Sequence, residues 1–142
     1  MSKKPLIIST DPGIDDVAAM TISLFAADLD VKMIVPTWGN VSLEHTLQNT
    51  LDLENFLHTK VPVVKGANQP LVRPAISAAS VHGETGIAGF EFEKANNDLL
   101  MSGLAATKMY EAIKSSPEKV TLLGIGPLTD FALLFKQYPD VV

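Results

Sequence analysis

Three aspartates fall within six positions near the start of the chain, in the stretch STDPGIDD. Asp11, Asp15 and Asp16 lie where an apolar run gives way to a helical pattern. Like charges in a partly desolvated position raise one another's pKa, and a bound cation removes that conflict. The donors are oxygens, with no cysteine and no histidine nearby, so they suit a hard cation such as Ca²⁺ or Mg²⁺. The cluster therefore predicts a metal or polyol site, and Gly13 would let a ligand approach the backbone closely.

Helix capping would also account for the same aspartates. Asp11 would then be the N-cap residue, with Pro12 in the first helical position. Asp15 and Asp16 would occupy the first turn, where the positive end of the helix dipole favours each carboxylate by under about 1 kcal/mol. The spacing alone leaves both interpretations open.

The elements around these residues alternate between strand-like and helix-like patterns. Strands are predicted for four short apolar runs, and helices for four amphipathic stretches, the second capped by Ser42. The strands are 6–10, 31–37, 61–65 and 120–124, and the helices are 14–27, 42–58, 102–115 and 127–137. This alternation predicts an α/β fold with an open, mostly parallel sheet flanked by helices.

Ligand sites in open parallel sheets lie beyond the carboxyl ends of the strands. That rule singles out three strand-to-helix joints, at residues 10–16, 37–42 and 124–129. The segment 66–98 shows no clean period and contains several prolines and glycines. A loop of that length is unusual in a compact domain, so we expect it to be an active-site loop.

Composition limits the classes of function. The chain has 142 residues, of which 46% are hydrophobic and 19% charged, as expected for one folded domain spanning 1–142. Its net charge of −5 gives no electrostatic footprint for nucleic acid or an anionic membrane. No segment approaches the roughly 18 apolar residues of a membrane helix. Without cysteine, disulfides, zinc–thiolate sites and thiol catalysis are excluded, which fits a cytoplasmic protein.

Four segments together resemble a known family. TDPGIDDVAAM, at 10–20, resembles the N-terminal signature D-T-D-P-G-x-D-D of the inosine–uridine-preferring nucleoside N-ribohydrolases. Three further segments agree in order and context: PTWGNVSLEHTLQN at 36–49, VHGETG at 81–86 and LLGIGPLTDFALLF at 122–135. The chain is identified as a member of this family, matching its N-terminal half. The resemblance implies a Rossmann-like nucleoside hydrolase fold, Ca²⁺ as cofactor and a role in nucleoside salvage.

The resemblance also implies which residues ligate the metal and perform the chemistry. Asp11 would be the general base and a Ca²⁺ ligand, Asp16 a second ligand, and Ile125 would offer its backbone carbonyl. Hydrolysis of the N-glycosidic bond passes through an oxocarbenium-like sugar that nearby carboxylates stabilise. Asp11 would remove a proton from a metal-bound water as it attacks, releasing free base and ribose.

Substrate contacts follow from the same resemblance. Asp15 and Asn40 would hydrogen-bond hydroxyls of the ribose, and His82 would lie on a loop over the nucleobase. The residue types by themselves also fit ordinary structural roles, because Asn40 follows a glycine as turn residues do and loop histidines are usually solvated. The implied partners are a small-molecule ribonucleoside and further copies of the chain in a homo-oligomer.

The chain departs from the family pattern in two residues and in length. Ser9 replaces the first aspartate of the signature, where we expect altered hydrogen bonding around the site, and Asp130 replaces a common asparagine. Family members are roughly twice as long, so a further metal ligand and an acid for the leaving base would be absent. We therefore expect little or no hydrolase activity from the 142-residue chain alone. The alternative function is a truncated, inactive relative that binds metal or ribose partially, or acts only with another chain.

Overall fold

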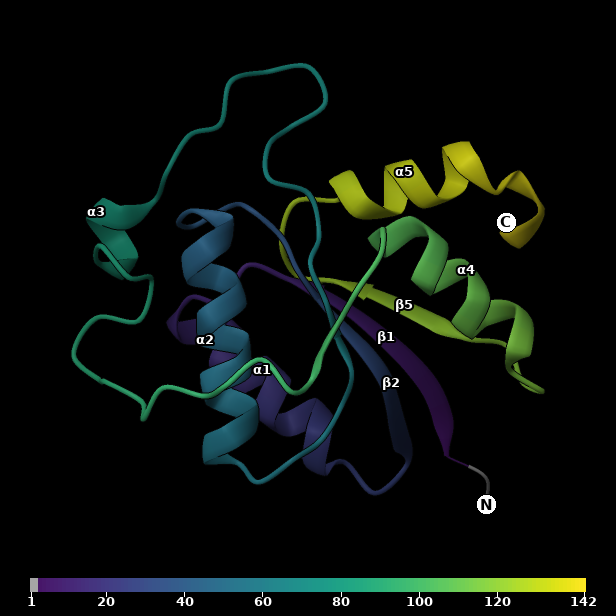
Figure 1. Ribbon diagram of the computed structural model, residues 1–142, viewed down its shortest axis with the longest axis horizontal. Helices are drawn as coiled ribbons and strands as arrows, with labels where there is room; N and C mark the ends of the chain where they lie inside the picture. The colour runs from purple at the N-terminus through teal and green to yellow at the C-terminus, as the bar shows by residue number, and fades with distance from the viewer. Residues whose placement is uncertain (1–2) are drawn as a thin grey trace.

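The computed structural model describes residues 3–142 and consists of one parallel sheet between two layers of helices (Figure 1). The sheet has five strands in the order β4-β3-β2-β1-β5. In chain order the elements are β1 (Lys4–Thr10), α1 (Ile14–Phe25), β2 (Leu29–Pro36), α2 (Leu43–Phe56), β3 (Val63–Val64), α3 (Ala79–His82), β4 (Leu100–Met101), α4 (Ala105–Ser115), β5 (Thr121–Gly124), α5 (Thr129–Gln137) and the 3-10 helix η1 (Pro139–Val141).

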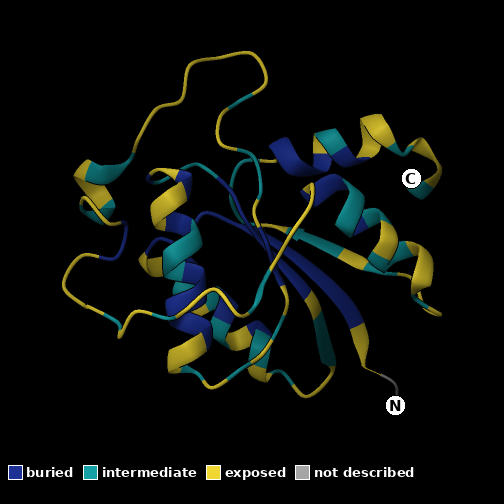
Figure 2. Ribbon diagram, in the orientation of Figure 1, coloured by how far each residue is buried: buried dark blue, intermediate teal, exposed yellow. Residues whose placement is uncertain are grey.

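Alternating residues of the central strands bury side chains in two cores. On β2, Met33 and Val35 face a cluster formed with α4 and α5, whereas Ile34 packs with Met20 of α1 and Leu53 of α2. This alternation is the two-residue period of a strand buried on both faces. Figure 2 shows the resulting pattern, with β1 and the second half of β2 buried between the helices.

The strand register brings the three predicted joints to one edge of the sheet. Thr10, the last residue of β1, pairs with Pro36 at the end of β2, and Ser9 pairs with Gly124 at the end of β5. The carboxyl ends of these three strands therefore lie side by side. The predicted parallel α/β fold is confirmed, and the joints at 10–16, 37–42 and 124–129 are neighbours in space.

Several predicted element bounds are wrong in detail. The strand predicted for 61–65 is reduced to Val63–Val64, and a further two-residue strand, β4, pairs with it at Leu100–Met101. Such short strands carry no usable period in the sequence. The helix predicted for 127–137 begins at Thr129, and the segment 66–98 contains the four-residue helix α3. No helix within residues 3–142 combines the length and hydropathy that crossing a bilayer requires.

Candidate functional site

Asp11 lies directly after β1, and its side chain is held by the segment that follows β2. The residue is only 6% exposed. Its Oδ2 accepts a hydrogen bond of 2.8 Å from the backbone N–H of Asn40, and its carbonyl oxygen accepts one of 2.9 Å from Asn40 Nδ2. Asn40 therefore grips the residue at both its carboxylate and its main chain.

Two glycines leave the space that the Asp11 carboxylate occupies. A Cβ atom on Gly39 would overlap Oδ2 of Asp11, and one on Gly126 would lie 2.6 Å from Oδ1. Any larger residue at either position would displace the carboxylate. Asp11 is thus enclosed between the joint after β2 and the joint after β5.

Asp16 is the second buried carboxylate of the site, on the first turn of α1. Its Oδ1 accepts a bond of 2.7 Å from the Thr10 hydroxyl, and its Oδ2 accepts one of 3.2 Å from the Gly13 N–H. The N-cap of α1 is Gly13, so the alternative with Asp11 as N-cap and Pro12 in the first helical position is wrong. The bond to Gly13 shows that Asp16 does help to close the helix terminus.

Burial raises the pKa of both carboxyls, and the charges of neighbouring aspartates add to the increase. For Asp11 the pKa rises from 3.8 to about 6, chiefly through desolvation, with smaller increases from the charges of Asp16 and Asp15. The Asn40 N–H opposes that increase by stabilising the carboxylate. Burial likewise raises the pKa of Asp16, against the hydrogen bonds from Thr10 and Gly13. The predicted repulsion is therefore present, and a cation placed between the two carboxylates would relieve it.

The structure buries two of the three aspartates rather than all three. Asp15 is exposed on the first turn of α1, because consecutive helical residues point in directions about 100° apart. Within residues 3–142 no three His, Asp or Glu side chains converge as a metal-binding group. The expected three-carboxylate cluster is corrected to the pair Asp11 and Asp16.

His82 and Asn40 converge on the turn that leads into α1. A Cβ on Gly13 would lie 2.7 Å from His82 Nδ1 and 2.8 Å from Asn40 Nδ2. His82 belongs to α3, which is anchored because the N–H of Ala78 donates to the Asn40 carbonyl at 2.8 Å. Nδ1 of His82 is buried without a hydrogen-bond partner among the described residues. The side chain is thus beside the aspartate joint rather than on a distant loop.

Ile125, the remaining predicted metal ligand, follows β5 next to this joint. Its N–H donates to the Ser9 carbonyl at 2.9 Å, which fixes the main chain beside β1. The hydroxyl of Ser9 itself is buried without a partner among the described residues. At Ser9 the contact with Ile125 is therefore made by the main chain and not by the side chain, and the altered hydrogen bonding expected from Ser9 stays a prediction.

Sequence reasoning missed several residues that hold the site together. Thr10 and Gly39 contact the two aspartates, and Asn49 of α2 donates to the carbonyls of Pro12 and Thr85 at 3.3 and 2.8 Å. Of these residues, only Gly39 could have been found from the sequence, because a glycine next to Asn40 lets another group approach the backbone closely. Asn49 lies 37 positions from Pro12 and 36 positions from Thr85, so no local sequence pattern could predict these bonds.

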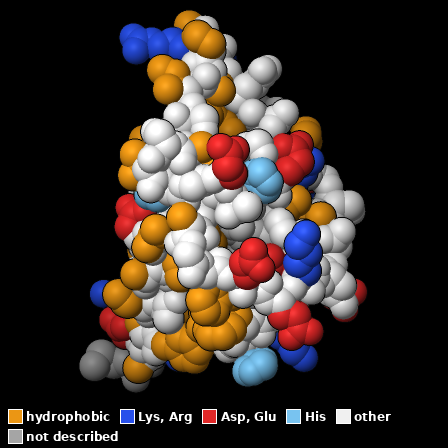
Figure 3. Space-filling view, turned by 90° about the vertical axis from the view of Figure 1, so that its left-hand side faces the viewer, with side chains coloured by type: hydrophobic (Ala, Val, Ile, Leu, Met, Phe, Trp, Pro, Cys, Tyr) orange, Lys and Arg blue, Asp and Glu red, His pale blue; other side chains and the backbone are white. Residues whose placement is uncertain are grey.

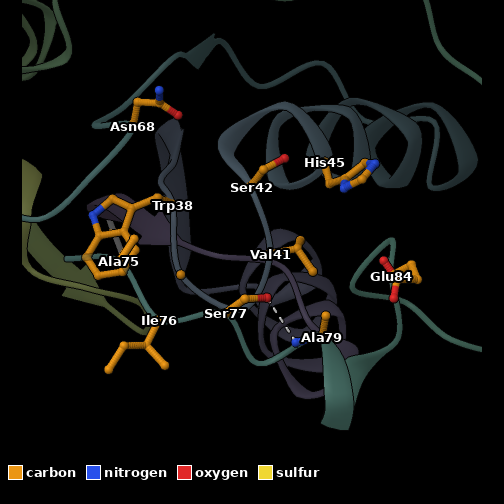
Figure 4. Close-up of a pocket in the computed structure, with 11 residues that line it drawn as sticks. Trp38, Val41, Ser42, His45, Asn68, Ala75, Ile76, Ser77, Ala79 and Glu84 are labelled. Atoms are coloured by element: carbon orange, nitrogen blue, oxygen red, sulfur yellow. Dashed lines mark hydrogen bonds between the residues drawn. The ribbon is translucent and has the colours of Figure 1, made fainter.

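A hollow of about 400 Å³ lies beside the site, between the start of α2 and the segment 68–84. Figure 4 shows Trp38 and Ile76 at one end of it and His45 and Glu84 at the other. Neither Asp11 nor Asp16 lines this hollow. The carboxylate pair is therefore not part of the lining of this hollow.

Comparison with known proteins gives a consistent result. The sequence model described as inosine-uridine preferring nucleoside hydrolase matches residues 6–142. The non-specific ribonucleoside hydrolase RihC of Klebsiella pneumoniae is 46% identical over 139 residues, which are 97% of this chain and 45% of that protein. The chain thus spans about half the length of the curated relatives it matches.

Solved structures agree with these relatives. A purine-preferring ribonucleoside hydrolase from Gardnerella vaginalis superposes with a TM-score of 0.90 at 25% identity, covering 97% of this chain and 45% of that one. The plant nucleoside hydrolase PpNRh1 gives a TM-score of 0.89 at 28% identity, covering 97% and 44%.

Proposed function

Because the chain belongs to the inosine–uridine preferring nucleoside hydrolase family, we propose that it supplies one wall of a site that hydrolyses ribonucleosides to free base and ribose. The observation that carries this proposal is the buried pair Asp11 and Asp16, held by Asn40 and Thr10 where β1 meets α1. The proposal concerns the residues present in this chain, which spans about half the length of its relatives.

We propose that this pair binds Ca²⁺, together with the backbone carbonyl of Ile125. All three donors are oxygens, which suit Ca²⁺, and the positive charge of the ion would offset both the burial and the repulsion from neighbouring aspartates that raise the pKa of the two carboxyls. When bound, the ion supplies positive charge that polarises water and the ribose hydroxyls. Ca²⁺ titration against Mg²⁺ would establish the preference.

Asp11 would act as the general base. A water oxygen forms a bond to the anomeric carbon while the C–N bond breaks, Asp11 accepts a proton from that water, and the departing base takes up a proton from bulk water. Without the ion the pKa of Asp11 is about 6, and bound Ca²⁺ would lower it, so the carboxylate is ionised at neutral pH and can accept the proton. Its negative charge would also stabilise the oxocarbenium-like transition state.

Asp15, Asn40 and His82 would contact the substrate. Asp15 is exposed on the same helical turn as Asp16, and Asn40 adjoins Asp11, so both suit hydrogen bonds to ribose hydroxyls. His82 has a buried nitrogen without a partner among the described residues and would contact the nucleobase. Because residues 66–98 bring His82 to this joint, we assign them as the active-site loop.

Two assays on the purified chain test the proposed function. Saturation-transfer NMR should detect Ca²⁺-dependent binding of inosine that is lost in Asp11→Ala and retained in the exposed-surface control Asp98→Ala. Release of ribose from inosine or uridine, abolished by Asp11→Ala, would show hydrolysis by the chain itself. Absence of any Ca²⁺-dependent inosine binding by a folded sample would overturn the proposal.

The second candidate is a relative without catalysis that binds metal or ribose, or that acts only with another chain. It is favoured by the two-carboxylate pair, which offers Ca²⁺ fewer than the six to eight oxygens it usually takes. Binding of inosine without release of ribose would select this candidate.

We also propose that the protein is a cytoplasmic homo-oligomer that serves nucleoside salvage. Hydrophobic side chains gather at the lower end of the face in Figure 3. Phe56 and Phe90 are 56% and 52% exposed, and their ring centroids lie 5.9 Å apart, with the ring of Phe92 packed against both. Exposed aromatic groups of this kind mark protein interfaces. Sedimentation velocity of the wild-type chain against Phe56→Gln measures the contribution of this surface.

A further inference from the structure

Asp130 is a buried carboxylate that the proposed reaction does not use. It lies in the first turn of α5 and is 2% exposed. Both of its oxygens accept the backbone N–H of Ala67, at 2.9 and 3.1 Å. Ala67 is the second residue of the loop 66–98, so Asp130 binds the loop where it leaves the sheet.

The loop root is pressed tightly between α5 and the end of β2. The N–H of Gly66 donates to the Pro36 carbonyl at 2.9 Å. A Cβ on Gly66 would lie 2.6 Å from Asp130 Oδ2 and 2.6 Å from the same Pro36 carbonyl. The clamp formed by Asp130, Gly66 and Ala67 therefore has no room for a larger residue.

Ala67 continues this clamp to the segment that grips Asp11. Its carbonyl accepts a bond of 3.0 Å from the N–H of Trp38 and one of 3.3 Å from the Thr37 hydroxyl. Two residues after Trp38, the Asn40 N–H donates to Asp11 Oδ2 at 2.8 Å. A chain of short contacts thus runs from Asp130 through Ala67 and Trp38 to the Asp11 carboxylate.

Helix α5 makes a second contact with the same segment. The indole Nε1 of Trp38 donates to the hydroxyl of Thr129, the residue before Asp130, at 3.3 Å. Trp38 is thereby fixed through both its main chain and its side chain. This leaves the backbone of 37–40 tied to α5 on one side and to Asp11 on the other.

We propose that Asp130 is a positioning residue, which through Ala67 and Trp38 holds the Asn40 N–H on the Asp11 carboxylate. The structural part of this proposal depends only on the contacts above. Its consequence for Ca²⁺ and ribonucleoside binding rests on the proposed function. An asparagine at position 130 retains one oxygen that accepts from Ala67, so it should preserve the clamp, whereas alanine removes it.

Amide hydrogen exchange followed by NMR tests the positioning role, with the amides of β1 as an internal reference. A loss of stability alone lowers protection in proportion to the reference, whereas a loosened clamp lowers it locally. In Asp130→Ala we expect protection of the Ala67 and Asn40 amides to fall at least tenfold more than the reference. In Asp130→Asn the two amides should stay within threefold of wild type.

Two further variants keep the test decisive. Gly66→Ala strains the clamp from its other side and should lower protection of the same two amides, including when Asp130→Ala is too unstable to fold. Asp52→Ala is the matched control, because Asp52 is a buried carboxylate that accepts the Ala95 N–H at 2.7 Å near the far end of the loop. It should lower protection of Ala95 and leave that of Asn40 equal to the reference.

Equal loss of protection at Asn40 and in β1 in both clamp variants would overturn the positioning role. A local loss at Ala67 without one at Asn40 would also overturn it, since Asp130 would then anchor only the loop. Ca²⁺ affinity, measured by calorimetry, should fall about tenfold in Asp130→Ala and be restored in Asp130→Asn. If the wild-type chain bound no Ca²⁺, the proposed function would fail while the exchange comparison still decided the role of Asp130.

Discussion

Replacing Asp11 by asparagine should stabilise the protein at neutral pH and remove much of its pH dependence. The side chain is buried, and its charge is opposed by desolvation and by the neighbouring Asp16. Asparagine has the same shape and still offers an oxygen to the Asn40 N–H. The substitution therefore removes the charge and retains the main contact.

The size of the effect follows from the pKa of Asp11. In the unfolded chain the carboxyl titrates near 3.8, and in the folded protein near 6. The folded state therefore holds the proton more tightly, so the stability contributed by protonation of Asp11 is fully present below pH 3.8 and is lost as the pH rises through 6. The full difference corresponds to about 3 kcal/mol in the free energy of unfolding.

Urea unfolding at a series of pH values between 4 and 8, without divalent cations, measures how much Asp11 contributes to the pH dependence of the free energy of unfolding. The free energy of unfolding of Asp11→Asn minus that of wild type should increase by about 2 kcal/mol from pH 4 to pH 8, or about 8 °C in Tm, because part of the full difference lies below pH 4. Asp16, Glu54 and Asp130 also have raised pKa values, but they are present in both proteins. Asp15→Asn, at the adjacent exposed aspartate, is the comparison and should give a smaller difference in the same direction, because the charge of Asp15 accounts for only a minor part of the raised pKa of Asp11.

Parallel stability curves for wild type and Asp11→Asn over this range would refute the reasoning. Such a result would mean that Asp11 is solvated or paired in the folded protein and carries no charge conflict. A cation between the two carboxylates would then have no repulsion to relieve.

The other predictions concern the residues around the same pair, and urea unfolding checks each of them. Thr10→Val removes the 2.7 Å bond to Asp16 and should lower the free energy of unfolding by about 1–2 kcal/mol. Ser9→Ala removes a buried hydroxyl without a partner among the described residues and should raise the free energy of unfolding by about 1 kcal/mol. A decrease in that free energy would reveal a hydrogen-bond partner of the hydroxyl, such as water. Gly39→Ala would place a Cβ on the Asp11 carboxylate, so it should cost about 1–3 kcal/mol and abolish Ca²⁺ binding in calorimetry.

Local patterns were sufficient to predict the fold and the edge of the sheet where the site lies. Apolar runs such as 6–10, followed by helical spacing from Ile14, fix both the element type and the parallel connection. Once strands are parallel, their carboxyl ends must share an edge, which places the segment of Asn40 beside Asp11. That Asp11 and Asn40 lie side by side could therefore be predicted from the periodicity of the elements and the parallel topology.

The bonds that define the site could not be predicted in the same way. Asp11 accepts a hydrogen bond from Asn40, which is 29 positions away, and Asp130 accepts one from Ala67, which is 63 positions away. Capping rules favoured Asp11 as N-cap, but tertiary contact with Asn40 engages that side chain and leaves Gly13 as the cap. Which of two adjacent aspartates is buried depends on the packing of α1, which the charge spacing does not encode.

Calorimetric titration of Ca²⁺ into the folded chain at pH 7.5 and pH 5 tests the central claim most directly. We predict a Kd on the order of a millimolar at pH 7.5. At pH 5 the affinity should be about tenfold lower, because Asp11, with a pKa of about 6, is then mostly protonated. Binding should disappear in Asp11→Asn and Asp16→Asn. A folded sample that gives no binding heat in Ca²⁺ well above a millimolar, or an affinity unchanged by either substitution, would contradict it.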